Sequence, residues 1–178
     1  MKTWAWLLAL SLALAGCGYE FGTARALTQR GLLRGVSLAV PVFFNDTFEV
    51  ALDKRITEFI RRQFLQAGGL TLAHEVGAAP LVLKGIVRSY GLQTMSFGSA
   101  SVTEQRVNLS VEVTFEDRRT DKQPWKQTYT TSAEFFVTGD LATNRSRQDR
   151  ATDEACQAMA EHIVSQVFDR LSDTETAR

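Results

Sequence analysis

Few residues in this 178-residue chain have the types and spacing that chemistry requires. Its two histidines, His74 and His162, lie neither in a metal-type spacing such as His-x-x-x-His nor near a pair of cysteines. The sequence also lacks a Gly-x-Ser-x-Gly nucleophile motif and a glycine-rich phosphate loop. We therefore interpret both histidines as ordinary surface or boundary residues, and we expect no catalytic residue, no metal site and no enzymatic activity.

The two cysteines lie in very different surroundings. Cys156 lies on the apolar stripe of a predicted helix, which indicates a buried structural thiol and not a nucleophile. Cys17 follows a positively charged start, Lys2, and a nearly all-apolar run over residues 7–15 that is too short to span a bilayer. This pattern is typical of an export signal that is removed after secretion.

The residues just before Cys17, Leu14-Ala15-Gly16, make this segment similar to the lipobox of bacterial lipoproteins, in which the cysteine is acylated. An ordinary secretory signal fits less well because its cleavage site favours a small residue after the cut, and an uncleaved anchor needs a longer apolar run. We expect residues 1–16 to be a signal peptide and Cys17 to carry covalent lipid, with no other cofactor. Gly18 replaces the Asp that commonly retains such proteins at the inner membrane, so we expect an outer-membrane anchor that faces the periplasm.

Length and charge limit the remaining possibilities. The chain after the signal is long enough for one domain with a real core. The whole chain carries 20 Lys and Arg against 20 Asp and Glu, and only Lys2 leaves with the signal, so no charge asymmetry indicates a nucleic-acid partner. Residues 17–35 are rich in Gly, Arg, Thr and Gln and are typical of a lipidated arm.

Alternating apolar residues over 36–42 predict a first strand. Because proline has no N–H to donate to a neighbouring strand, we expect this strand to end at Pro41 or to lie at an edge of the sheet. A loop over 43–47 follows. Asp46 and Glu49 have the spacing of a capping box, and the apolar period that follows predicts a helix that ends at Gly68-Gly69.

Three longer strands are predicted over 81–93, 105–117 and 125–137. The first is apolar on both faces, so we expect it to be central or to contain a bulge at Gly85. The other two alternate cleanly, and we expect the stretch 98–101 to form a hairpin tip.

A last amphipathic helix is predicted over about 147–171, which gives the order β-α-β-β-β-α. We predict an α+β fold, a two-layer sandwich in which two helices pack on one face of a four-stranded, mostly antiparallel sheet. The domain would span 36–172 and be followed by a polar tail, 173–178, that frays. The other face of the sheet is polar, which fits a solvated face and a hydrophilic docking surface about equally well.

Short motifs along the chain give it a family resemblance. They are Cys-Gly-Tyr-x-Phe at 17–21, Val-Pro-Val-Phe-Phe-Asn-Asp-Thr at 40–47, and Leu-Lys-Gly-Ile-x-x-x-Tyr at 83–90, followed by a polar-tipped hairpin with Trp125 and a terminal helix. With these motifs the sequence resembles the LptE family of lipopolysaccharide-assembly lipoproteins over nearly the whole chain after the signal.

The resemblance implies a function. A member of that family would plug the lumen of the outer-membrane β-barrel LptD, help the barrel assemble and assist delivery of lipopolysaccharide to the cell surface. A wet, polar lumen suits a polar sheet face. Lipopolysaccharide phosphates would bind basic side chains, for which the candidates are Lys84, Arg88, Arg106 and Lys126.

Two other functions stay open at the level of sequence. A strand followed by Phe-x-Asn-x-Thr and an amphipathic helix also occurs in CsgG-like secretion-pore lipoproteins and in lipoprotein activators of peptidoglycan synthases. A CsgG-like pore needs long amphipathic membrane hairpins, and an activator usually has a much longer disordered arm. The LptE resemblance is therefore the preferred interpretation.

Overall fold

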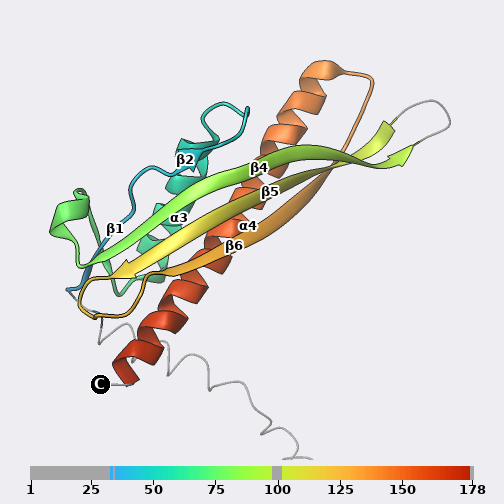
Figure 1. Cartoon of the computed structure of the whole chain (residues 1–178). Helices are drawn as coiled ribbons and strands as arrows, with labels where there is room; N and C mark the ends of the chain where they lie inside the picture. Colours follow the sequence, from blue (N-terminus) through green and yellow to red (C-terminus); the bar gives the residue numbers. More distant parts are fainter. Residues whose placement is uncertain (1–32, 34, 98–101, 177–178) are drawn as a thin grey trace, which may run out of the picture.

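The computed structural model describes residue 33 and residues 35–97 and 102–176 of the chain. They form a long, twisted sheet with two helices on one of its faces (Figure 1). In chain order, with the labels of Figure 1, the elements are β1 (Ser37–Ala39), β2 (Phe44–Asn45), α3 (Leu52–Ala67), β3 (Thr71–Ala73), the 3-10 turn η1 (Val76–Ala78), β4 (Leu81–Phe97), β5 (Val102–Asp117), β6 (Trp125–Phe136) and α4 (Leu141–Thr176). The predicted α+β class and the two-helix layer are confirmed.

The sheet is larger and less antiparallel than the predicted four strands. Its order is β3-β1-β4-β5-β6, and β2 also pairs with β4. The three short strands β1, β2 and β3 all pair in parallel, whereas β4, β5 and β6 form an antiparallel meander. The prediction of a four-stranded antiparallel sheet is therefore wrong in detail, because two- and three-residue strands carry no periodicity that a sequence pattern can detect.

The first predicted strand is shorter than expected for a physical reason. The pairing of β1 with its neighbouring strands ends at Ala39. Val40 and Pro41 follow, and proline has no backbone N–H to donate to the sheet. Arg61 of α3 then donates two hydrogen bonds to the Val40 carbonyl, from Nε at 3.0 Å and from Nη2 at 2.6 Å. The helix thus satisfies a carbonyl that the ladder no longer reaches.

The long strand β4 is central in the sheet, which confirms one of the two predicted alternatives. It also contains a bulge, although not at Gly85, the position given in the other alternative. Gly85 pairs regularly with Val113; the first register shift lies between Val87 and Ser89, and further irregularities follow between Thr94 and Phe97. Because Arg88 is an extra residue, it reverses which side chains of β4 face the core. Leu83 and Val87, two odd-numbered residues, face the core before the bulge, whereas the even-numbered Tyr90 packs against the core after it. This exchange explains why the sequence of β4 reads as apolar on both faces.

Gly85 has a different role, which is to make room for an aromatic ring. A Cβ atom at this position would lie 2.1 Å from Cε2 of the buried Phe43. The Phe43 ring therefore lies directly on the backbone of β4, and only glycine allows this approach.

The start of α3 also differs from the prediction. The helix begins at Leu52, its N-cap residue Ala51 has φ +60° in the left-handed region, and no side chain caps it. Asp46 and Glu49 lie in the preceding loop and form other contacts, so the predicted capping box is wrong. The predicted end of the helix is confirmed, since Gly68 follows the last helical residue and donates its amide to the Phe64 carbonyl.

One continuous core fills the space between the helices and the inner face of the sheet. The predicted alternation of β5 is confirmed, with Val107, Leu109, Val111, Val113 and Phe115 buried. The last helix is longer at both ends than predicted and runs from Leu141 to Thr176, so most of the segment predicted as a fraying tail continues the helix. No helix of the described residues is long and apolar enough to cross a membrane.

Candidate functional site: a charged sheet face and an apolar loop

The four predicted basic residues all project from the outer face of the sheet, opposite the helices. Lys84 and Arg88 come from β4, Arg106 from β5 and Lys126 from β6. Lys84, Thr114 and Lys126 occupy one row across the three strands. Arg106 lies eight residues from Thr114 along β5, a separation of about 27 Å at the rise of a strand. The structure therefore brings three of the four residues together and leaves Arg106 apart.

Each of these cations has a carboxylate partner on the same face. Lys84 pairs with Glu116 at 2.7 Å, and Arg106 pairs with Glu134. Arg88 and Lys126 share Glu112, at 3.0 and 2.9 Å, and Arg88 also reaches Asp46 at 3.4 Å. The outer face is thus a network of alternating charges and not a basic patch.

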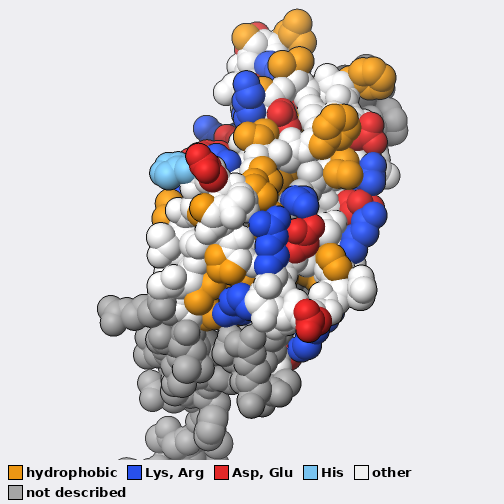
Figure 2. All heavy atoms as spheres, turned by 60° about the vertical axis from the view of Figure 1, so that its left-hand side comes forward, with side chains coloured by type: hydrophobic (Ala, Val, Ile, Leu, Met, Phe, Trp, Pro, Cys, Tyr) orange, Lys and Arg blue, Asp and Glu red, His pale blue; other side chains and the backbone are white. Residues whose placement is uncertain are grey.

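The pairing shifts protonation in the expected directions. Hydrogen bonding from Lys126, with a further contribution from Arg88, lowers the pKa of Glu112. The hydrogen bond from Lys84 likewise lowers the pKa of Glu116, and the hydrogen bond to Glu112 raises the pKa of Arg88. All these groups stay charged at neutral pH. Figure 2 shows Lys and Arg side chains directly beside Asp and Glu side chains over the face of the molecule that it displays.

A second feature of the surface is apolar and was not predicted. The loop between β2 and α3, residues 46–51, exposes Phe48 and Val50, whose relative accessibilities are 106% and 88%. Phe44 on β2 is also 65% exposed. Large apolar side chains that gather in one exposed segment are typical of an interaction site. In the sequence, the capping pattern of this segment had assigned it to a helix start.

Specific contacts hold this loop in place. The Asn45 side chain accepts a hydrogen bond from the Thr47 backbone N–H at 3.1 Å and donates one to the Glu49 carbonyl at 2.8 Å. At one end of the loop Asp46 pairs with Arg88 of the sheet, and at the other Glu49 pairs with Arg145 of α4 at 3.2 Å. The loop therefore presents Phe48 from a braced framework that is tied to both layers of the fold.

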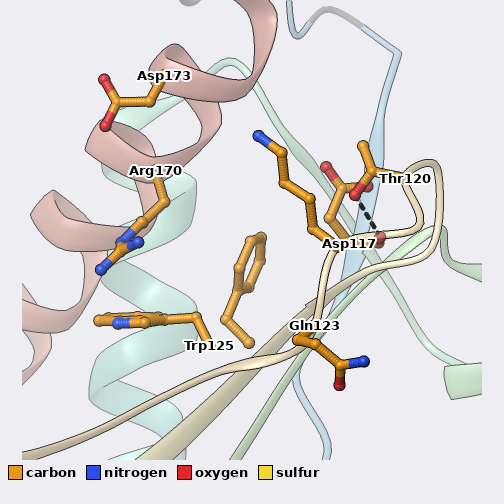
Figure 3. A pocket seen from close by; sticks show the side chains of 8 residues that line it. Asp117, Thr120, Gln123, Trp125, Arg170 and Asp173 are labelled. Carbon is orange, nitrogen blue, oxygen red and sulfur yellow. Dashed lines mark hydrogen bonds between the residues drawn. The ribbon is translucent and has the colours of Figure 1, made fainter. Parts of the chain in front are cut away.

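A small cavity of about 130 Å³ lies where the turn between β5 and β6 meets the end of α4. The Arg170 guanidinium stacks over the Trp125 ring at 5.1 Å, and Asp117, Thr120 and Gln123 line the opposite side (Figure 3). Arg119 holds the Asp117 carboxylate with hydrogen bonds of 2.9 and 2.8 Å. The stacked Arg170 and Trp125 close this end of the domain.

The remaining chemistry-bearing residues behave as structural ones. Cys156 is fully buried in α4, and burial raises the pKa of its thiol to about 12. This confirms the predicted structural thiol. His74 and His162 are exposed. In the described part of the chain, no three His, Cys, Asp or Glu residues cluster as a metal site would need. Cys17, the rest of the predicted signal and arm over residues 1–32 and 34, and the predicted hairpin tip at 98–101 lie outside the described residues.

The family model described as LptE, lipopolysaccharide-assembly, matches residues 36–167. The chain belongs to this family. The match spans all the strands, α3 and most of α4, and includes the charged sheet face and the apolar loop. The family is one of non-enzymatic lipoproteins, which is consistent with the expectation that the chain is not an enzyme.

Solved structures share the fold at low sequence identity. The hypothetical protein CT253 from Chlamydia trachomatis is 14% identical with a TM-score of 0.56, over 76% of this chain and 97% of that one. The rare lipoprotein B from Shewanella oneidensis is 16% identical with a TM-score of 0.54, over 78% and 98% of the two chains. A lipoprotein from Caulobacter crescentus is 14% identical with a TM-score of 0.53, over 83% and 98%. A comparison with curated protein sequences found no significant match.

Proposed function

We propose that this chain is an outer-membrane lipoprotein that forms a complex with the β-barrel LptD and assists the transport of lipopolysaccharide to the cell surface. The family match over residues 36–167 carries the proposal. In this proposal Cys17 bears the lipid anchor and residues 18–35 lead from the membrane to β1. Several acyl chains on one cysteine would hold the protein on its membrane, since a single chain binds only marginally.

The two surfaces of the domain suit a wet barrel lumen in different ways. The outer sheet face carries paired charges and hydroxyl groups, such as Thr128 and Thr130, which stay solvated among the polar side chains of a lumen. The exposed Phe48 and Val50 would dock against an apolar part of the barrel or its loops. Because the loop is already braced by Arg88 and Arg145, little conformational freedom would be lost when it binds.

The proposed contact with lipopolysaccharide involves the same four basic residues. Lys84, Arg88 and Lys126 lie close enough together to meet one phosphorylated headgroup, and Arg106 would contact a separate part of the ligand. A phosphate has to compete with Glu112 and Glu116 for these cations. Exposed ion pairs of this kind stabilise by only about 0–1 kcal/mol, so the exchange is energetically feasible.

Affinity purification tests the barrel complex. Tagged full-length protein, extracted in mild detergent, should carry a large outer-membrane barrel in near equal amount. The double substitution F48A/V50A should lower barrel recovery, whereas the matched control L65A, which truncates another exposed apolar side chain on α3, should not. Recovery of a peptidoglycan synthase or a homo-oligomeric ring in place of the barrel would overturn the proposal.

A further inference from the structure

One motif of the arm, residues 17–35, has no part in the proposed function. It is the segment 19–21, Tyr-Glu-Phe, which follows Cys17 and Gly18 directly. Its two aromatic residues are the only ones in the arm, and Glu20 is the only acidic residue there, since the other charged residues of the arm are arginines. Such a segment suits a cavity that offers aromatic rings and positive charge together.

The cavity between the β5–β6 turn and the end of α4 offers both. Phe115 and Trp125 line it with aromatic rings, and Lys122 and Arg170 line it with basic groups. Its volume of about 130 Å³ is close to the roughly 150 Å³ of an apolar cavity that holds benzene. The cavity is therefore large enough for the ring of one aromatic side chain.

The charge that lines this cavity is mainly positive. Of its two acidic residues, Asp117 is paired with Arg119 at 2.8 Å. The carboxylate of the other, Asp173, points away from the cavity (Figure 3). Lys122 and Arg170 therefore make the cavity attractive to a carboxylate, which basic side chains hold through charge-assisted hydrogen bonds.

The arm joins the domain at the same end as the cavity. Leu38 pairs with Leu81, and Leu81 pairs with Asp117, which lines the cavity. Two strand spacings thus separate Leu38 from Asp117 by about 10 Å, and the five residues from Leu33 to Leu38 span at most about 18 Å. Glu20 lies 13 residues before Leu33 and can reach about 43 Å, well beyond the sum of these two distances. Figure 1 shows the start of β1, the β5–β6 turn and the end of α4 together at one end of the molecule.

We propose that residues 19–21 of the arm dock in this cavity. The Phe21 ring lies beside Trp125, where two aromatic rings attract each other and both leave water. The Glu20 carboxylate binds the ammonium group of Lys122. The aromatic and acidic residues of the arm thereby gain a binding site on the folded domain itself.

Docking of the arm fixes how the domain stands on its membrane. Cys17 lies three residues before Glu20, so the two are at most about 11 Å apart. Through an undocked arm, Cys17 could lie up to about 53 Å from Leu33. The docked arm therefore holds the β5–β6 turn and the end of α4 close to the lipid. This orientation rests on the lipid anchor of the proposed function, whereas the docking itself does not.

The fluorescence of Trp125 tests whether the arm fills the cavity. Trp125 is the only tryptophan left once residues 1–16 are removed. In lipidated full-length protein in mild detergent, a docked arm shields this ring from the quencher acrylamide. E20K should increase the quenching of Trp125, and the double variant E20K/K122E should restore the shielding. The control T28K adds a positive charge elsewhere on the arm and should leave the quenching unchanged.

A disulfide tests where the segment docks. E20C and K122C in one chain should form an intramolecular disulfide when the membranes are treated with a mild oxidant. E20C with H74C should not, although His74 is exposed and follows β3, the strand on the other side of β1. A maleimide mass tag, applied after denaturation, reads the result. With Cys17 blocked by lipid, an unlinked chain takes three tags, including one on Cys156, and a linked chain takes one.

Two results would overturn the inference. One is equal cross-linking of E20C to H74C and to K122C. The other is equal quenching of Trp125 in the wild type and in E20K when both have the same thermal melt. Neither experiment involves the barrel, so co-purification can fail while the arm docks, and docking can fail while the barrel is recovered.

Discussion

The contact between Phe43 and Gly85 supports a quantitative prediction about stability. In G85A the new Cβ would lie 2.1 Å from the Phe43 ring, whereas carbon atoms in contact prefer about 3.5–4.0 Å. The buried ring must therefore move by more than about 1 Å, and overpacking of this kind destabilises by about 1–3 kcal/mol. F43A removes the ring altogether and should destabilise by about 3–5 kcal/mol.

Urea unfolding of the chain without residues 1–17, followed by the fluorescence of Trp125, measures these free energies. The double variant G85A/F43A should lose less than the sum of the two single variants, because the added methyl group occupies space that the ring has left. G91A is the matched control, since a Cβ on Gly91 of the same strand meets no atom within 4 Å. Additive losses in the double variant, or equal losses in G85A and G91A, would refute the packing argument.

Three further predictions concern titratable groups. Because its partners lower the pKa of Glu112, this carboxylate stabilises the fold at neutral pH and loses that effect as the pH falls below the ordinary value of 4.5; E112Q should therefore be less stable at pH 7 in urea melts and less sensitive to acid. The Tyr129 hydroxyl is buried without a hydrogen-bond partner in the described chain, so Y129F should raise the free energy of unfolding by about 1 kcal/mol. Burial raises the Tyr129 pKa from 10.0 to about 12, so between these pH values the phenol ionises only in the unfolded state; the free energy of unfolding of the wild type, unlike that of Y129F, should therefore fall as the pH rises from 10 to 12. Cys156 should react with a thiol reagent at pH 8 only after unfolding, and rapid reaction of the native protein would contradict its burial.

Regular patterns in the sequence predicted the larger elements well. The alternation in β5 and β6 depends on burial of one face alone, which is a local property of the sequence; the structure matches it throughout the inner face of β5 and in β6 except at Gln127, which is exposed on the helix side. The end of α3 was also predictable, because a Gly-Gly pair terminates the apolar period. The family resemblance rested on similar local motifs, and the family model confirms it.

The features that sequence patterns missed are decided by contacts between distant segments. The parallel pairing of β1 with β3 involves three residues on each strand, too few for a periodic signal. The position of the bulge at Arg88 depends on how β4 pairs with β5. The apolar loop was not predicted because the spacing of Asp46 and Glu49 fits a capping box at a helix start. In the structure these two residues instead pair with Arg88 and Arg145, which lie far away in the sequence.

The basic residues show the same limit at the candidate site. Their placement on the polar face of the strands followed from alternation, and the structure agrees. Their carboxylate partners could not be predicted, because Glu112 meets Arg88 and Lys126 only through the register of three strands. This register turns a set of isolated cations into a charge network.

Depletion of the protein in a cell that depends on it tests the proposed function most directly. The amount of lipopolysaccharide at the cell surface should fall, with peptidoglycan cross-linking unchanged, and wild-type protein but not F48A/V50A should restore it. An unchanged amount of surface lipopolysaccharide together with altered peptidoglycan cross-linking would contradict the account.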